Sequence, residues 1–163
     1  MKTQLTFAPF SAYSPGIIYN MLIESYAPAK EIVLREEQAW KEFDQSVFEN
    51  PETIGKCGFV SSLENEPVGF ASWDPRNLPE FALVGHDCIL PKFQGQGLGR
   101  LQLIEVVKRL NKLRVKKIKV STGADGFFLP ARRMYLSGGF QEIRRAPHHT
   151  IPNFEVVYFE KVI

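Results

Sequence analysis

The sequence contains little of what marks secreted or membrane proteins. Its 163 residues include only two cysteines, Cys57 and Cys88, which form no C-x-x-C pair and no disulfide framework. Residues 1–5 lack the apolar run of a signal peptide, and no apolar segment is long enough to span a membrane. These absences predict reduced thiols in a cytoplasmic protein that has no membrane partner.

A marked excess of either charge is also missing. Lysine and arginine number 20 against 18 acidic residues, and the net charge of +2 predicts no strong polyanion partner such as a nucleic acid. The basic residues between Lys108 and Lys119 are therefore interpreted as a solvated helix face and turn. His148 and His149 are adjacent but have no third ligand, which makes a poor metal site, so no metal is expected.

The length and the 44% hydrophobic content predict one domain over residues 1–163. The hydrophobic pattern predicts the order strand, two helices, three strands, helix, strand, helix and two strands. The expected strands cover residues 4–10, 58–63, 68–73, 81–90, 117–121, 141–145 and 154–159, and the expected helices cover residues 14–26, 35–48, 98–110 and 130–137. This order predicts an α/β fold with about seven strands and helices on both faces of the sheet.

Two local features of this pattern can be tested directly in the structure. Residues 64–67 have the composition of a hairpin turn between two strands. In the third helix, apolar residues recur at helical intervals and are predicted to face one side. These residues are Leu98, Leu101, Ile104, Val107 and Leu110.

The most informative segment is ILPKFQGQGLGR, which runs from Ile89 to Arg100. Gly95, Gly97 and Gly99 leave main-chain N–H groups uncovered just before a helix whose first N–H groups have no intrahelical partners. Such a segment binds phosphate through these donors and through the helix dipole. The dinucleotide fingerprint fails because Arg100 stands at its third glycine, and the P-loop pattern fails because its lysine is missing.

The glycine pattern that does fit is Q-x-x-G-x-G, from Gln94 through Gly97 to Gly99. It resembles the acyl-CoA pyrophosphate loop of the GNAT acyltransferase superfamily. The predicted order of strands and helices is similar to the GNAT fold over essentially the whole chain. The resemblance implies a mixed central sheet and an enzyme that uses an acyl-CoA, most often acetyl-CoA, as its cosubstrate.

A second motif lies in the fourth predicted helix. The spacing from Ala131 through Tyr135 to Gly139 and Phe140 resembles the family pattern A-x-x-x-Y-x-x-x-G-F. Many members of the family also have an asparagine three residues before the helix alanine, where it helps to hold CoA. This chain has Phe128 at that position, so the contact is absent or supplied by another residue.

The resemblance implies which residues bind acetyl-CoA. The pyrophosphate is expected on the N–H groups from Gly95 to Arg100, and the pantetheine arm along the main chain of the strand before the loop. The implied residues are Cys88, Ile89, Leu90, Gln94, Gly95, Gln96, Gly97, Leu98, Gly99 and Arg100. N–H groups of the same strand are expected to polarise the thioester carbonyl as an oxyanion hole.

The resemblance also implies direct attack of an amine on the thioester in a ternary complex. Tyr135 is expected to donate a proton to the leaving thiolate. His86 is a candidate general base, and Asp87 is expected to orient it, to bind a cationic substrate or to act as the base itself. Glu80 is a third candidate base. A strand histidine with satisfied contacts and a turn-capping aspartate are the structural alternatives for His86 and Asp87.

Other functions stay open at this point. The amine is predicted on a small molecule, while a protein N-terminus or lysine, and a non-catalytic acyl-CoA sensor, are the alternatives. A nucleotide-binding protein fits less well, and a homodimer is expected only because family members are often dimers. Cys88 is not needed as a covalent nucleophile. Four aromatic residues either line the pocket for the amine or pack in the core: Trp40, Trp73, Phe127 and Phe128.

Overall fold

The computed structural model describes residues 4–163. The chain forms two compact units. The first contains the residues up to Trp73 together with His86–Gln102, and the second contains Asp74–Gly85 and Leu103–Ile163. One strand and one helix therefore contribute to both units. The expectation of a single domain over the whole chain stays a prediction.

The strands and helices follow the predicted order. The strands are β1 (Leu5–Ala8), β2 (Gly58–Leu63), β3 (Glu66–Asp74), β4 (Ala82–Ile89), β5 (Lys117–Gly123), β6 (Gln141–Pro147) and β7 (Glu155–Val162). The helices are α1 (Ile17–Tyr26), α2 (Lys30–Glu49), α3 (Leu98–Lys112) and α4 (Leu129–Ser137), with 3-10 turns η1 (Phe10–Ala12), η2 (Ile54–Lys56), η3 (Pro91–Phe93) and η4 (Gly126–Phe128). None of the described helices has both the length and the apolar character needed to cross a membrane.

The seven strands form one sheet in the order β1-β2-β3-β4-β5-β7-β6. Strand β4 runs parallel to β5, whereas β1–β2, β2–β3, β5–β7 and β6–β7 are antiparallel pairs. The predicted α/β fold with a mixed, seven-stranded sheet is therefore confirmed. Helix α2 begins at Lys30, earlier than predicted, and β1 ends at Ala8 because Pro9 cannot donate to a strand ladder.

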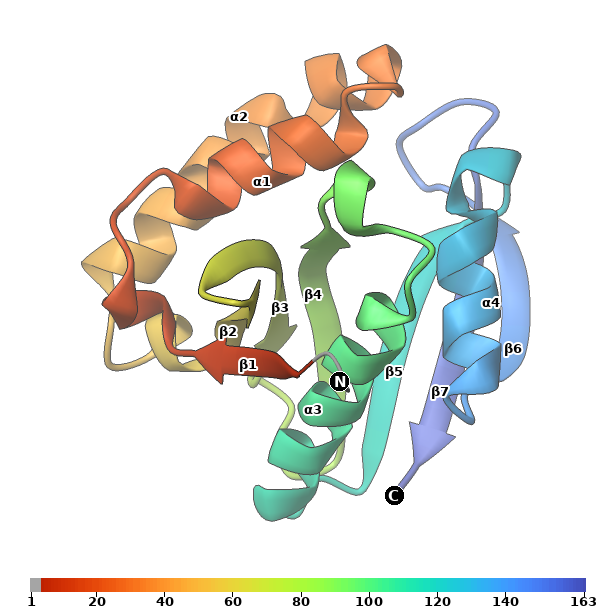
Figure 1. The fold of residues 1–163 in the computed structure, drawn as a ribbon. Coiled ribbons are helices and arrows are strands. Elements are labelled where there is room, and N and C mark those ends of the chain that lie inside the picture. The colour runs from red at the N-terminus through yellow and green to blue at the C-terminus, as the bar shows by residue number, and fades with distance from the viewer. Residues whose placement is uncertain (1–3) are drawn as a thin grey trace. The chain divides into compact units, whose positions relative to one another are not determined.

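In the first unit, helices cover both faces of the strands. Helices α1 and α2 lie side by side (Figure 1) and pack on one face in an apolar cluster that includes Ile18, Trp40 and Phe70. On the other face, Leu98 at the start of α3 packs with Val68. The helices on both faces agree with the prediction for this part of the chain.

Helix α1 begins on a carboxylate supplied by α2. The side chain of Asp44 is buried and accepts hydrogen bonds from the N–H groups of Gly16, Ile18 and Tyr19 at 2.8, 3.0 and 3.1 Å. These N–H groups would otherwise be unsatisfied at the helix start. Asp44 therefore explains why α1 begins here without a capping side chain of its own.

The hairpin between β2 and β3 has a two-residue turn, as its composition predicts. Glu64 and Asn65 have φ values of 49° and 67°, and Leu63 pairs with Glu66. Positive φ at both central positions is the signature of a type I′ turn, whose twist matches that of the flanking strands. The predicted hairpin is therefore confirmed.

The residues predicted to face one side of α3 are only partly buried, because Leu98 and Leu110 are buried but two of the others are not. Leu101 and Ile104 are 42% and 53% exposed, whereas Gln102, Leu103 and Val106 are buried. Residues spaced by three rotate by about 60° at each step around a helix with 3.6 residues per turn, so a strict three-residue repeat cannot stay on one face. The buried residues instead follow steps of four from Leu98.

In the second unit, the start of β4 pairs with β5 at Ala82↔Ile118 and Leu83↔Lys119. Helix α4 lies beside β6 and β7 (Figure 1). It ends at Ser137 and is followed by the C-cap Gly138 and by Gly139, whose φ of 85° lies in the left-handed region. The predicted glycine cap is therefore present, and the following Phe140 is buried, as predicted.

Candidate active site

The glycine-rich loop has an open main chain. Gly95 and Gly97 have φ values of 77° and 80°, and a Cβ atom built on either glycine would meet no neighbouring atom of residues 4–163 within 4 Å. The positive φ values explain why both positions are glycine, and no described residue fills the space where a side chain would stand. Gly95, Gln96 and Gly97 are all exposed. This arrangement leaves room for a ligand to approach the main chain closely.

Helix α3 adds further donors to the end of this loop. The helix has 15 residues and begins at Leu98, which is buried and anchors the first turn. The first helical hydrogen bond of this segment runs from the N–H group of Leu101 to Gly97 O, at 3.3 Å. The preceding N–H groups of Leu98, Gly99 and Arg100 point out of the helix end. The loop and helix start together form a main-chain site suited to an anion.

Gln94 connects the loop to β4. The turn η3 leads from β4 to this residue, and its Nε2 atom donates to the carbonyl oxygen of Ile89 at 2.8 Å. This bond connects the start of the glycine-rich loop to the last residue of β4.

Two further side chains bind carbonyl groups of β4. Ser72 Oγ donates to the carbonyl oxygen of His86 at 2.7 Å, and Gln102 Nε2 donates to that of Cys88 at 3.3 Å. At the end of the strand, the N–H group of Leu90 donates to Val68 O at 2.8 Å. Leu90 is one of the residues predicted to bind pantetheine, but its N–H group is already bonded within the protein.

The sequence interpretation did not single out Ser72 or Gln102. Gln102 is a polar residue among apolar ones at four-residue steps along α3, so the correct helical phase would have revealed it. Ser72 lies in an apolar strand segment, and no signal in the sequence distinguishes it from a serine that simply tolerates burial.

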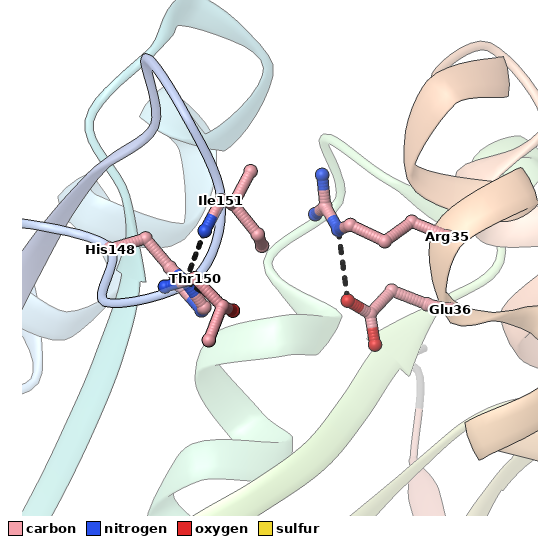
Figure 2. A network of polar contacts seen from close by, with 5 residues as sticks. All are labelled: Arg35, Glu36, His148, Thr150 and Ile151. Atoms are coloured by element: carbon pink, nitrogen blue, oxygen red, sulfur yellow. Dashed lines mark hydrogen bonds and ion pairs between the residues drawn. The ribbon is translucent and has the colours of Figure 1, made fainter.

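His86 lies against α2. Its ring centroid is 4.9 Å from that of Phe43. Burial lowers the pKa of His86 below its ordinary value, while the negative charge of Glu36 acts in the opposite direction. Glu36 is itself paired with Arg35, whose Nε atom lies 3.0 Å from Oε1 (Figure 2). The imidazole is therefore neutral near pH 7 and able to accept a proton.

Asp87 acts electrostatically on its neighbours. Burial, followed by the Asp87 charge, raises the pKa of the Tyr26 hydroxyl. Burial is the main reason why the pKa of the Cys88 thiol is raised to about 12. The Ser25 hydroxyl lowers this pKa and the Asp87 charge raises it further, so the thiol is neutral. A thiol with such a pKa is a poor nucleophile.

Tyr135 belongs to the second unit. Its side chain is 3% exposed, and its ring centroid lies 5.7 Å from those of Phe140 and Phe159. In the same unit, Phe128 packs over Gly123, where a Cβ atom would lie 2.3 Å from its ring. Phe128, which replaces the family asparagine, is therefore a packing residue here. The roles of Tyr135, His86 and Asp87 in catalysis stay predictions.

The remaining candidates have structural partners. Glu80, the weakest candidate base, pairs with Lys116 at 2.7 Å. Nδ1 of His148 accepts hydrogen bonds from the N–H groups of Thr150 and Ile151, both at 3.1 Å, so this histidine organises its own loop (Figure 2). Within residues 4–163, no group of three or more His, Cys, Asp or Glu side chains could hold a metal ion.

The aromatic candidates divide between core and surface. Trp40 and Trp73 are both buried, and the ring of Trp40 lies 5.1 Å from that of Tyr26. Phe127 is exposed and contacts Phe128 edge to face. The two tryptophans are therefore core residues.

Comparison with known proteins identifies the family. The model of the acetyltransferase (GNAT) family matches residues 18–140. No curated protein sequence matches the chain significantly. Among solved structures, a GNAT family acetyltransferase from Elizabethkingia anophelis with acetyl-CoA bound is 18% identical, with a TM-score of 0.70 and coverage of 99% of this chain and 100% of that one.

A second structure with this fold is the ribosomal-protein-S18-alanine N-acetyltransferase from Escherichia coli. It is 16% identical, with a TM-score of 0.68 and coverage of 98% of this chain and 94% of that one. Ard1 from Thermoplasma volcanium is 12% identical, with a TM-score of 0.74 and coverage of 98% and 97%. These likenesses agree in fold with the family model, which matches most of the chain. The chain belongs to the GNAT family of acetyltransferases.

Proposed function

We propose that this acetyltransferase moves the acetyl group of acetyl-CoA to a primary amine of a small molecule. The amine attacks the thioester directly while both substrates are bound. The observation that carries the cosubstrate assignment is the open glycine loop at Gly95 and Gly97, which leads directly into the N-terminal N–H groups of α3. Such donors suit the pyrophosphate of CoA without needing a specific side chain.

Strand β4 supplies the second part of the proposal. In an antiparallel pair, the N–H and C=O groups of a residue point to the same neighbour, and this direction alternates along the strand. The N–H of Leu90 and the carbonyls of His86 and Cys88 are engaged within the protein. The N–H group of Ile89 then points away from β3 and is the proposed donor to the pantetheine arm or the thioester oxygen.

The proton transfers need two groups. A protonated amine must lose a proton before it attacks, and the leaving thiolate must gain one. His86, whose burial favours the neutral imidazole, is the proposed base, with Asp87 close by. Tyr135, whose phenolic O–H can donate a proton, is the proposed acid.

The fold does not select the amine. The Escherichia coli protein with this fold is named for the N-acetylation of a ribosomal-protein alanine, and another similar structure is described as a phosphinothricin N-acetyltransferase. A protein amine therefore remains the second candidate for this chain.

The first experiment compares thermal unfolding with acetyl-CoA, CoA, NADH and ATP, followed by thiol release from acetyl-CoA over a panel of small amines and N-terminal peptides. A ligand that binds only the folded state raises the melting temperature as its saturation rises. Stabilisation by acetyl-CoA and CoA alone, with thiol release on one amine class, is expected. Stabilisation without any thiol release would favour an acyl-CoA sensor, and no CoA effect at about 1 mM would contradict the cosubstrate assignment.

A further inference from the structure

Gln102 is a buried polar residue on an otherwise apolar side of α3. Leu98 and Val106, four residues before and after it, are buried as well, and Gln102 is 3% exposed. A buried amide is costly unless its polar atoms find partners. The position therefore has a specific reason to be polar.

Both polar atoms of the Gln102 amide are hydrogen-bonded. Its Oε1 atom accepts a hydrogen bond from Ser61 Oγ at 2.7 Å, and its Nε2 atom donates to Phe70 O at 2.9 Å and to Cys88 O at 3.3 Å. Carbonyl oxygens only accept, so the amino group must face Phe70 and Cys88, which fixes the orientation of the amide. One side chain thus connects strands β2, β3 and β4 of the first unit.

The Cys88 carbonyl also packs closely against Gly69 of β3. A Cβ atom on Gly69 would lie 2.2 Å from Cys88 O, so this oxygen occupies the space that a side chain would need. Gly69 leaves room for the carbonyl, and Gln102 supplies a donor for it. The direction of this C=O group is therefore fixed from two elements.

The direction of one carbonyl determines the direction of the next N–H group. The C=O of Cys88 and the N–H of Ile89 belong to the same planar, trans peptide unit and point in opposite directions. The bond from Gln102 to Cys88 O consequently aims the Ile89 N–H. The bond from Ser72 to His86 O, at 2.7 Å, aims the Asp87 N–H in the same way.

We infer that Gln102 is a positioning residue for acetyl transfer, which aims the Ile89 N–H at the bound acetyl-CoA. The inference rests on the proposed function, because the Ile89 donor matters only when a thioester lies beside β4. Donors fixed in direction before the reaction stabilise developing charge without reorganisation. Gln102 touches no substrate and acts only through the peptide unit between Cys88 and Ile89.

The test compares Gln102→Leu with Gln102→Glu. Loss of a single oxyanion donor lowers kcat by about 100-fold to 1000-fold, and a donor that is only misdirected should cost less, about 10-fold in Gln102→Leu. An ionised glutamate cannot donate to Cys88 O, but its protonated form can. The ratio of kcat in Gln102→Glu to that of wild type should therefore rise as the pH falls, whereas the ratio for Gln102→Leu should stay constant.

The matched control is Ser62→Ala. Ser62 is another buried polar residue of β2, and its Oγ lies 3.2 Å from the Tyr13 hydroxyl instead of bonding β4. This variant should lose stability and keep its kcat. If Gln102→Leu also loses only stability and keeps kcat within about twofold, Gln102 has a purely structural role and the inference is overturned.

A second measurement does not depend on turnover. In wild type, acetyl-CoA should shift the amide resonance of Ile89 in a ¹H–¹⁵N spectrum, and in Gln102→Leu this shift should be lost or reduced. If wild type binds acetyl-CoA without turnover, the proposed function fails, and the Ile89 resonance still decides the positioning role. An equal response of Ile89 in both proteins would overturn the inference.

Discussion

The glycine loop and strand β4 offer the same chemical group in two different ways. Between Gly95 and Arg100, N–H groups are available because side chains are missing and a helix begins. Between His86 and Ile89, the N–H directions follow from side chains that bind the preceding carbonyls. The loop depends on the local conformation of two glycines, whereas β4 depends on contacts from β3 and α3.

This difference assigns different kinetic roles to the two regions. An exposed loop that binds pyrophosphate holds the ground state and the transition state equally, so damage to it should raise KM for acetyl-CoA. Donors aimed at the thioester act where charge develops, so damage to their aim should lower kcat. The predictions below test this division.

Tyr135 tests whether main-chain donors are sufficient for the reaction. If both regions act as proposed but the thiolate still needs a proton, Tyr135→Phe should lower kcat by about 10-fold to 1000-fold, within or near the usual range of general acid catalysis. KM for acetyl-CoA should change little. Steady-state thiol release over a range of acetyl-CoA concentrations measures both constants, and a variant with full kcat would exclude Tyr135 as the acid.

The loop side of the comparison is tested by Gly97→Ala. A left-handed conformation costs a non-glycine residue about 1–2 kcal/mol, and the new methyl group would stand in the space now free above Gly97. We expect KM for acetyl-CoA to rise about 10-fold with a nearly unchanged kcat. Gly126→Ala is the control, because its Cβ also meets no atom within 4 Å and its φ is not positive. A fall in kcat alone would contradict the division of roles.

The strand side is tested by Ser72→Ala. This change removes the bond to His86 O and frees the direction of the Asp87 N–H. A hydrogen bond of about 1 kcal/mol corresponds to about a 5-fold change in rate, so kcat should fall by about that factor while KM for acetyl-CoA stays constant. Ser62→Ala again serves as the buried-serine control. Equal kcat values in the two variants would show that Ser72 does not position the donor.

The same contrast explains what the sequence could predict. The loop is readable because glycine spacing encodes conformation locally, and Gly95 and Gly97 have the positive φ values that favour glycine. The hairpin at Glu64 and Asn65 and the cap at Gly139 were predictable for the same reason. The order of strands and helices followed from hydrophobic pattern, because burial of one face imposes a period on each element.

The roles of Gln102 and Ser72 could not be predicted in this way. Their importance comes from carbonyl groups of β4, which lie 14 residues away from each of them in the sequence. The helical phase predicted for α3 had the same effect, since it grouped Leu101 and Ile104 with Leu98 and left Gln102 unnoticed. The correct helical phase would have shown that Gln102 is buried, but contacts between segments far apart in the sequence leave no local pattern that names the carbonyl bonded by Gln102 or Ser72.

The smallest expected effect comes from the side chain of His86 and distinguishes its role from that of the main-chain donors of β4. Burial lowers the pKa of His86 below its ordinary value of 6.5, so the folded protein binds fewer protons than the unfolded chain just below that pH. His86 therefore contributes stability that is fully present above about pH 6.5 and declines as the pH falls toward its lowered pKa. His86→Gln should flatten this decline in denaturant unfolding between pH 7.5 and 5.5.

The same substitution tests His86 as the base. The acid limb of kcat/KM in wild type should lie below the ordinary imidazole pKa, and it should disappear in His86→Gln. The Ile89 N–H group is a main-chain donor, so KM for acetyl-CoA should not change. If the stability profile flattens while the kcat/KM profile stays unchanged, His86 is a buried structural histidine, and Asp87 becomes the candidate base. In that case β4 would act on acetyl-CoA through its main chain without help from the His86 side chain.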